Sequence, residues 1–247
     1  MLWLLLTVAG FLAFSFLVLR GEDLSYLDQP LPHHPPTAES EELKEALSEL
    51  RAFAAQSGGG LGLGRDRIRL LREFMDSMSA AREYECEFEA VANADVRGEW
   101  VLPAGGSSTR RILYIHGGAF LAGSPLSHRA RLTGASVFAV DYRLMPEHRR
   151  LAGIEDCRTA YRWLLETGPE GREPAEWIAV AGDSAGGNLT LSLLAWVRDT
   201  GLRQADAGVA FSPATDAALD APSLRANIET DAMLGPAFGK LARLPRV

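Results

Sequence analysis

The sequence is poor in cysteine and lysine, and it has no histidine after His148. Its 247 residues include 2 cysteines, too few for a disulfide framework or a four-thiolate zinc site. Cys86 and Cys157 are therefore expected to be buried small apolar residues. Lys44 and Lys240 are the only lysines, and 25 basic residues face 32 acidic ones, for a formal net charge of -7. Because a basic excess is absent, we expect no nucleic-acid partner.

Charge is missing from residues 1–19, which precede Arg20. About 20 apolar residues are what one helix needs to cross the hydrocarbon core of a bilayer. The segment has no basic start, and no small-x-small pair lies near Arg20, so we expect a membrane anchor over residues 1–20. A cleaved signal peptide, which would release a secreted protein, and a buried helix of a soluble protein are the alternatives.

Prolines crowd residues 29–36, which excludes a helix interior there and predicts a linker. His33 and His34 lie in this linker without a third ligand nearby, so no metal site is expected. Two amphipathic helices are expected next, over residues 40–56 and 67–78, because apolar residues recur there at helical spacing.

Beyond residue 80, short apolar runs alternate with helical patterns. This alternation predicts an α/β fold with a mostly parallel sheet and right-handed crossovers. Strands are expected at residues 84–91, 96–102, 112–115, 136–140, 177–181 and 209–211, the first two as an antiparallel pair. Helices are expected at residues 154–165 and 185–197.

A candidate nucleophile follows the predicted strand at residues 177–181, where residues 182–186 read G-D-S-A-G. The order strand, G-x-S-x-G, helix is typical of a reactive serine held in a strained turn, whose neighbours two positions away must be small. The positive end of the following helix can stabilise an oxyanion near Ser184. A glycine-rich turn without chemistry is the alternative, whereas a Walker phosphate loop would need a lysine that is absent here.

A second motif, His116-Gly117-Gly118, follows the predicted strand at residues 112–115. Consecutive glycines allow backbone N–H groups to point toward a substrate oxygen. An oxyanion hole is expected to take one N–H from this loop and one from Ala185, the residue after the candidate nucleophile, and each donor contributes on the order of 3 kcal/mol in the transition state. His116 is expected to organise the loop rather than act as general base, because the base of such a triad comes late in the chain.

These motifs together resemble the hormone-sensitive-lipase-like (GDXG) branch of the α/β-hydrolases. The resemblance rests on H-G-G-A-F at residues 116–120, D-Y-R-L-M-P-E-H at 141–148 and G-D-S-A-G-G-N at 182–188. It implies an α/β-hydrolase fold and a serine carboxylesterase or lipase that cleaves small acyl esters through an acyl-enzyme, without cofactor or metal. It also implies that Ser184 is the nucleophile and that Asp183 flanks it as an organising residue. The resemblance further implies that Gly117, Gly118 and Ala185 supply the N–H groups of the oxyanion hole.

The apolar run and the resemblance together give the expected domain limits. The apolar run predicts an anchor at 1–20 that contacts the lipid membrane. The resemblance implies a linker with amino-terminal cap helices at 21–80 and an incomplete hydrolase core at 81–247, and it also shows departures from the family pattern. Ala119 stands where the family has a third glycine. Arg149 and Arg150 stand where proline and aromatic residues are common.

The remaining departure concerns the triad, whose order in this fold is serine, acid, histidine. Several aspartates follow Ser184, but no histidine does. Asp216 is interpreted as a turn or cap residue and His148 as structural. Without a base, a serine hydroxyl is a weak nucleophile.

We therefore expect a carboxyl-terminally truncated family member that lacks the last strands of the sheet, has an open edge near residues 209–211 and hydrolyses esters poorly. The alternatives are a protein that binds a small ligand without turnover and a non-functional truncated product.

Overall fold

The computed structural model describes residues 10, 14, 40–56, 65–80, 84–128, 134–216, 221–231 and 234–235. The chain divides into two compact units, Met1–Ala46 and Leu47–Val247. The predicted anchor at 1–20 and the predicted linker at 29–36 lie outside the described part, apart from two single residues of the former. In the ranges that are described, no helix has both the length and the apolarity to cross a bilayer.

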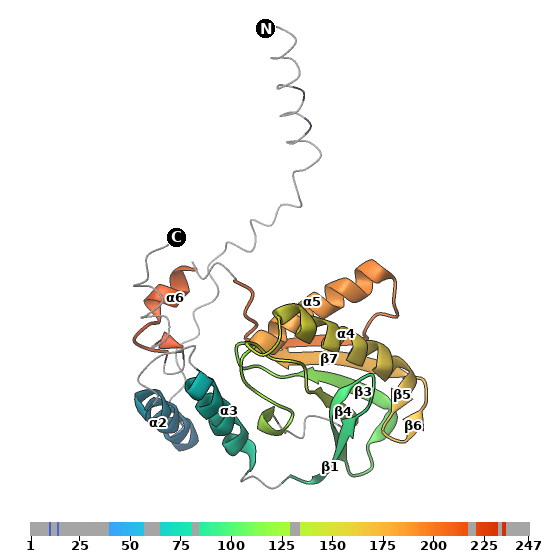
Figure 1. Cartoon of the computed structure of the whole chain (residues 1–247), viewed down its shortest axis with the longest axis horizontal. Helices are drawn as coiled ribbons and strands as arrows, with labels where there is room; N and C mark the ends of the chain where they lie inside the picture. The colour runs from blue at the N-terminus through green and yellow to red at the C-terminus, as the bar shows by residue number, and fades with distance from the viewer. Residues whose placement is uncertain are drawn as a thin grey trace. The chain divides into compact units, whose positions relative to one another are not determined.

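A six-stranded sheet lies at the centre of the second unit (Figure 1). Its strands follow the order β1 (Cys86–Ala92), β2 (Arg97–Pro103), β4 (Ala135–Val140), β3 (Ser107–Ile115), β7 (Trp177–Asp183) and β8 (Ala207–Phe211). The last four of these run parallel to one another, whereas β2 is antiparallel to both β1 and β4. The sheet is therefore mostly parallel, and the amino-terminal antiparallel pair is present, as predicted.

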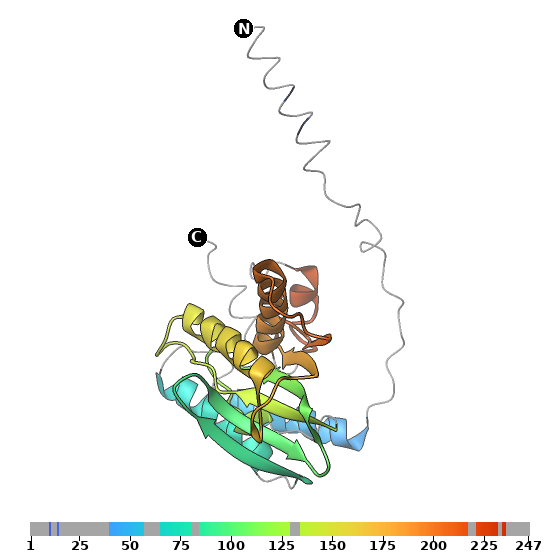
Figure 2. The same ribbon diagram turned by 90° about the vertical axis from the view of Figure 1, so that its right-hand side faces the viewer.

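One face of the sheet is covered by α4 (Arg150–Glu166) and α5 (Ala185–Thr200), which lie side by side (Figures 1 and 2). Leu113 and Ile115 of β3 point to this face and share a buried cluster with Leu164 of α4 and Leu193 of α5. The intervening strand residues, such as Ile112, form a smaller cluster on the other face, as the two-residue period of a strand requires. Because β3 and β7 are buried on both faces, their ends are held in place. The H-G-G motif begins at the end of β3, and the G-D-S-A-G motif begins at the end of β7.

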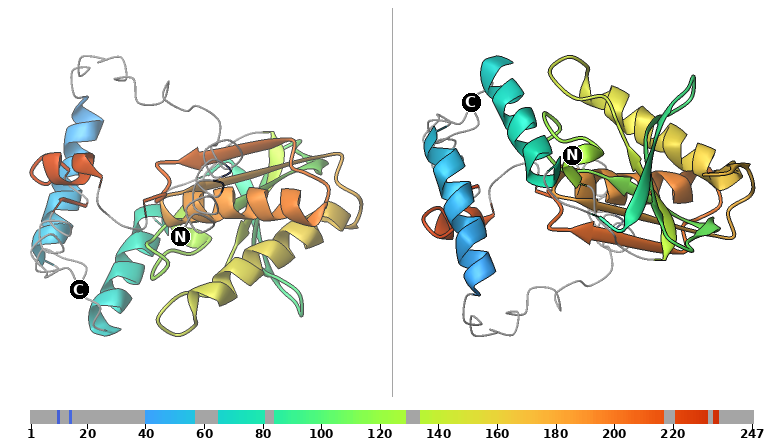
Figure 3. Two further views of the ribbon diagram at one scale, coloured as in Figure 1. Left: turned by 90° about the horizontal axis from the view of Figure 1, so that it is seen from above. Right: turned by 90° about the horizontal axis from the view of Figure 1, so that it is seen from below.

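The connection from β3 to β4 carries the short 3₁₀ helix η2 (Leu126–His128). This helix lies beside α3 (Arg65–Ala80), a contact that can be followed in Figure 3. Since the connection starts directly at His116, α3 is close to the loop that follows the end of β3.

The two predicted amino-terminal helices are confirmed as α2 (Glu41–Gln56) and α3. The Ser40 hydroxyl accepts the N–H of Leu43 at 3.2 Å, which caps α2 at its amino end. Cys157 is buried in α4 as expected, but Cys86 is only partly buried because it begins the outermost strand, β1.

Several predicted boundaries were wrong where an element begins with exposed or polar residues. The helix predicted from residue 154 begins at Arg150. The prediction missed its first turn because that turn is exposed, with Leu151 61% accessible, and breaks the apolar pattern. The strand predicted from residue 112 begins at Ser107, and the prediction missed its first half because those residues are polar. The short elements β5 (Thr167–Gly168), β6 (Gly171–Arg172) and α6 (Pro222–Ala226) were not predicted, since they are too short for a periodic pattern.

Strand β8 lies at one edge of the described sheet. Its Val209 and Phe211 are 44% and 49% exposed. Both are large apolar residues, so this edge is the least covered part of the sheet as described.

Candidate functional site

The predicted nucleophile turn joins the end of β7 to the start of α5. Ser184 lies between the two elements with φ 51° and ψ -114°, a backbone conformation that is strained for a residue with a side chain. Two hydrogen bonds hold this conformation: the Ser184 N–H donates to the Phe211 carbonyl at 2.9 Å, and the Ala214 N–H donates to the Ser184 carbonyl at 3.0 Å. The strain is therefore supported from the end of β8 and the loop after it.

Gly182 and Gly186 allow this turn to pack directly on the end of β3. A Cβ atom at Gly182 would lie 2.6 Å from the carbonyl oxygens of both Ile115 and Gly186. A Cβ at Gly186 would collide with the same Ile115 carbonyl and lie 2.6 Å from that of His116. The two glycines of G-x-S-x-G thus bring the turn into backbone contact with the loop that carries the second motif.

That loop, residues 116–124, is called the oxyanion loop below. Gly118, Ala119 and Phe120 follow one another with positive φ values of 113°, 56° and 61°. The Gly118 carbonyl points inward and accepts the N–H groups of Leu121 and Ala122 at 3.0 and 2.9 Å. Within the described ranges, the N–H groups of Gly118 and Ala119 donate to no protein atom. Two adjacent amides are consequently available to an external acceptor.

The Gly117 amide behaves differently from what the sequence predicts. Its N–H donates to Asp183 Oδ1 at 2.9 Å, so in this structure it is occupied by the protein itself. The predicted donor set of Gly117, Gly118 and Ala185 is thus corrected: Ala119 replaces Gly117 among the unpartnered amides. Ala185, at the first position of α5, is also without a backbone acceptor in the described part of the chain, as expected for the first turn of a helix.

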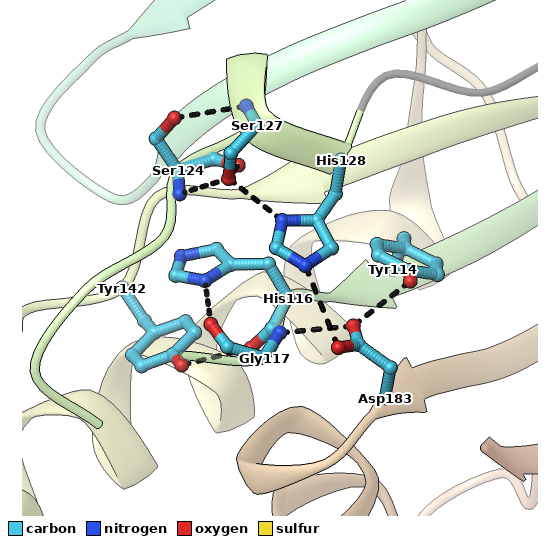
Figure 4. A network of polar contacts seen from close by, with 8 residues as sticks. All are labelled: Tyr114, His116, Gly117, Ser124, Ser127, His128, Tyr142 and Asp183. Atoms are coloured by element: carbon cyan, nitrogen blue, oxygen red, sulfur yellow. Dashed lines mark hydrogen bonds and ion pairs between the residues drawn. The ribbon is translucent and has the colours of Figure 1, made fainter. Parts of the chain in front are cut away.

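The Asp183 carboxylate is the centre of a polar network beside the turn (Figure 4). In addition to the Gly117 amide, the Tyr114 hydroxyl donates to Asp183 Oδ1 at 2.9 Å, and His128 Nε2 lies 3.4 Å from Asp183 Oδ2. Burial alone would raise the pKa of Asp183, but the donors of His128, Tyr114 and Gly117 outweigh burial and lower this pKa. The carboxylate is therefore ionised at neutral pH and ties three parts of the chain together.

His116 is buried beneath the oxyanion loop. Its ring stacks on Tyr142 with centroids 4.3 Å apart, and its Nδ1 lies 2.8 Å from the Gly117 carbonyl (Figure 4). Burial lowers the pKa of His116 to about 4, so the ring is neutral at pH 7 and its Nδ1–H donates to that carbonyl. Tyr142 in turn donates its hydroxyl to the His116 carbonyl at 2.8 Å. These bonds connect His116 to Gly117 and Tyr142, and the loop-organising role of His116 stays a prediction.

His128 is a site residue that the sequence analysis missed. Its Nδ1 lies 2.7 Å from the Ser127 hydroxyl, which contacts Ser124 in the same turn. The Ser124 hydroxyl donates to Asp76 of α3 at 2.5 Å. A continuous line of polar contacts thus runs from α3 to Asp183. No local motif marks His128, because its partner is far away in sequence; its only signal is that histidine is scarce in this chain.

Helix α3 is attached to the oxyanion loop through Arg72. The guanidinium donates to the Leu121 carbonyl at 2.8 Å and to the Met145 carbonyl at 3.1 Å. It also forms a two-pronged contact with Glu147, at 3.0 and 2.9 Å, which lowers the pKa of that carboxyl to about 2. One arginine thereby fixes three positions around the loop.

No general base accompanies Ser184 among the residues that the structure describes. No side chain in these ranges hydrogen-bonds to the Ser184 hydroxyl; both ring nitrogens of His128 contact other groups, and His116 Nδ1 binds the Gly117 carbonyl while its buried Nε2 has no partner in the described part of the chain. His148 is exposed, and Asp216 accepts the N–H of Ala221 at the start of α6, in agreement with its interpretation as a turn or cap residue. No cluster of three metal-binding side chains occurs in the same ranges. The site as described contains a serine and free amides, without an imidazole on the serine.

Comparison with known proteins places this arrangement in a family. A family profile described as alpha/beta hydrolase fold matches residues 112–241. A crystal structure of an esterase from the bacterial hormone-sensitive lipase family is 31% identical and has a TM-score of 0.66, with 85% of this chain and 72% of that chain aligned. The chain belongs to the hormone-sensitive-lipase-like α/β-hydrolases. The esterase EstE5, with 31% identity and a TM-score of 0.69 over 83% of this chain and 68% of that chain, is similar as well.

Curated relatives within this family are also named as esterases. Esterase LipU of Mycobacterium tuberculosis is 42% identical over 144 residues, which cover 56% of this chain and 46% of the relative. Carboxylesterase NlhH of the same species is 35% identical over 179 residues, which cover 69% of this chain and 56% of the relative. The chain thus spans about half the length of these curated relatives.

Proposed function

We propose that this chain carries the nucleophile and the oxyanion hole of a serine carboxylesterase, with Ser184 as the nucleophile. The proposal is carried by one observation: a serine in a strained turn between β7 and α5, in backbone contact with a loop that has unpartnered amides. The names of the similar esterases support the same chemistry and a small acyl ester as substrate.

The proposed reaction begins when Ser184 Oγ attacks the ester carbonyl carbon and loses its proton to a base. The carbonyl oxygen becomes negatively charged, and the N–H groups of Gly118, Ala119 and Ala185 are the proposed donors to it. The tetrahedral intermediate collapses, the alcohol leaves with the proton, and an acyl-enzyme remains. Water then repeats the sequence, which releases the acid and restores the serine.

The proton acceptor in this scheme is an imidazole, and no residue near Ser184 in the described structure supplies one. We therefore propose that Ser184 turns esters over slowly wherever no imidazole reaches its hydroxyl, because serine enzymes without one triad member are slower by several orders of magnitude. The unpartnered amides and the strained backbone of Ser184 do not depend on that base. The absence of an imidazole near Ser184 in the described structure also favours the alternative, a protein that binds a small ligand without turnover.

A short-chain p-nitrophenyl ester tests the proposal, first with the chain itself and then with the chain extended by the carboxyl-terminal segment of a similar esterase. We expect the extension to raise hydrolysis by about a hundredfold or more, and Ser184→Ala to abolish the gain. Absence of Ser184-dependent hydrolysis in the extended chain would contradict the proposal. Tight binding of the ester that survives Ser184→Ala without turnover would favour the ligand-binding alternative, and failure of the chain to unfold cooperatively would favour a non-functional product.

Two further proposals concern the amino-terminal part of the chain. We propose that α3 belongs to a cap over the site, supported by its Arg72 contacts with the oxyanion loop. We also propose that residues 1–20 attach the protein to a membrane, supported by the absence of charge in residues 1–19. Carbonate extraction of membranes tests the second: the full chain should stay in the pellet, and a chain that starts at Leu24 should not.

A further inference from the structure

Arg150 makes a further connection between the oxyanion loop and α5, in addition to the contacts of Asp183 and of the two glycines described above. It is the first residue of α4, and its guanidinium carbon lies 4.1 Å from the centroid of the Phe120 ring. Its Nη2 donates to Asn188 Oδ1 at 2.8 Å. In the part of the chain that the structure describes, no carboxylate forms an ion pair with Arg150. The guanidinium therefore contacts the Phe120 ring and the side-chain oxygen of Asn188.

The first of these partners, Phe120, belongs to the oxyanion loop and directly follows Ala119. Its φ of 61° is unusual for a bulky side chain and persists only where the surroundings hold it. The Phe120 carbonyl accepts the N–H of Met145 at 2.9 Å, and Arg150 contacts the ring of the same residue. Backbone and side chain of Phe120 are thus held by different groups.

The second partner, Asn188, lies in the first turn of α5, the helix that follows the nucleophile. Its N–H donates to the Ser184 carbonyl at 3.1 Å, and its Nδ2 donates to the Ala214 carbonyl at 2.9 Å. Since Ala214 also binds the Ser184 carbonyl, Asn188 is part of the frame around the strained serine. Its remaining oxygen is the atom that Arg150 binds.

We propose that Arg150 is a positioning residue that holds the oxyanion loop against the helix carrying the nucleophile. This inference rests on the proposed function. The candidate oxyanion donors come from two separate pieces of backbone, Gly118 and Ala119 on the loop and Ala185 on the helix. Such donors act together only when all lie about 2.7–3.1 Å from one oxygen, so their relative position has to be fixed. Arg150 fixes it from the outer side, through Phe120 and Asn188.

Hydrogen–deuterium exchange of the full chain tests this role without requiring turnover. Arg150→Met replaces the aliphatic stem with one of similar length and removes the cation and its hydrogen-bond donors. We therefore expect amide exchange in residues 118–123 and 212–216 to rise about threefold or more. Arg149→Met is the matched control, because Arg149 precedes the same helix and makes no side-chain capping bond. Arg150→Lys retains the cation and is expected to exchange more slowly than Arg150→Met. Equal exchange in Arg150→Met and Arg149→Met, or a rise spread evenly over β3 and β7, overturns the proposal.

A kinetic measurement adds a readout that a purely structural role would not change. In a chain with Ser184-dependent ester hydrolysis, Arg150→Met should lower kcat about tenfold and change KM less than about twofold, because misaligned donors weaken mainly the transition state. Unchanged kcat in such a chain overturns the proposal even where exchange rises. If hydrolysis survives Ser184→Ala, the proposed function fails, whereas the exchange measurement still decides whether Arg150 holds the loop.

Discussion

Two of the attachments of the oxyanion loop, one through Asp183 and one through Arg150, differ in their surroundings. The inner one is the Asp183 carboxylate, whose side chain is 30% exposed and which binds Gly117, Tyr114 and His128. The outer one is Arg150, which is exposed and contacts Phe120 and Asn188. Charge-assisted bonds in a partly buried network are stronger than a single exposed cation–π contact. We infer that the inner attachment stabilises the fold and that the outer one controls the local order of the loop.

Removal of the inner attachment is expected to have the largest effect. Asp183→Ala leaves three donors without their acceptor, and unsatisfied donors cost about 1 to 3 kcal/mol each, less where water enters, so the free energy of unfolding should fall by about 3 to 4 kcal/mol. Urea denaturation measures this change. The control is Asp199→Ala, because Asp199 is 62% exposed and, among the described residues, its side chain pairs with its neighbour Arg198 alone. Similar losses in both variants would contradict the distinction between the two attachments.

Acid should weaken the inner side of the loop through His116. Its pKa is about 4 in the folded protein against 6.5 ordinarily, so the unfolded chain binds the proton more readily. Stability from this group is therefore complete above about pH 6.5 and is lost as the pH falls toward 4, by about 2 kcal/mol between pH 7 and pH 5. Urea denaturation at both pH values measures it.

Two variants isolate this contribution. His116→Gln should remove about 2 kcal/mol of the pH dependence, whereas His148→Gln, at an exposed histidine, should retain it. If the two variants have the same pH dependence, the loss of stability in acid comes from other groups.

A smaller change to the inner network should show how its members depend on each other. Tyr114→Phe removes one hydroxyl donor to Asp183 and keeps the ring, so the free energy of unfolding should fall by about 1 kcal/mol. In the Asp183→Ala background the same substitution should cost less than half as much, because its acceptor is already gone. Additive losses would indicate that the Tyr114 hydroxyl acts independently of Asp183.

The local parts of this site were predictable from sequence, whereas its long-range contacts were not. The turn around Ser184 follows from the spacing of Gly182 and Gly186 between an apolar run and a helical pattern, which are all neighbours in the chain. The Gly117 amide was assigned to substrate because its local sequence is that of a donor loop. Its actual acceptor, Asp183, is 66 residues away, and no local pattern specifies such a pairing.

The same reason explains the other omissions. His128 acts through Asp183, and Arg150 acts through Asn188, which is 38 residues further along the chain. In sequence Arg150 appeared only as a departure from the family pattern. Long elements such as α5 were predicted from their periodicity, but β5 and β6, with two residues each, carry no period to detect.

The smallest expected effect completes the comparison at the outer attachment. Arg150→Met should lower the free energy of unfolding by only about 0.5 kcal/mol, because an exposed cation–π contact contributes about 0.5 to 1 kcal/mol and an exposed hydrogen bond is partly replaced by water. Arg149→Met should change it less, and both values come from the same urea titrations as those of Asp183→Ala. If Arg150→Met lowers the free energy of unfolding as much as Asp183→Ala does, the exposure of an attachment does not determine how much it stabilises the fold. In that case Arg150 belongs to the frame of the fold as much as Asp183 does, and its effect on the loop could not be separated from global stability.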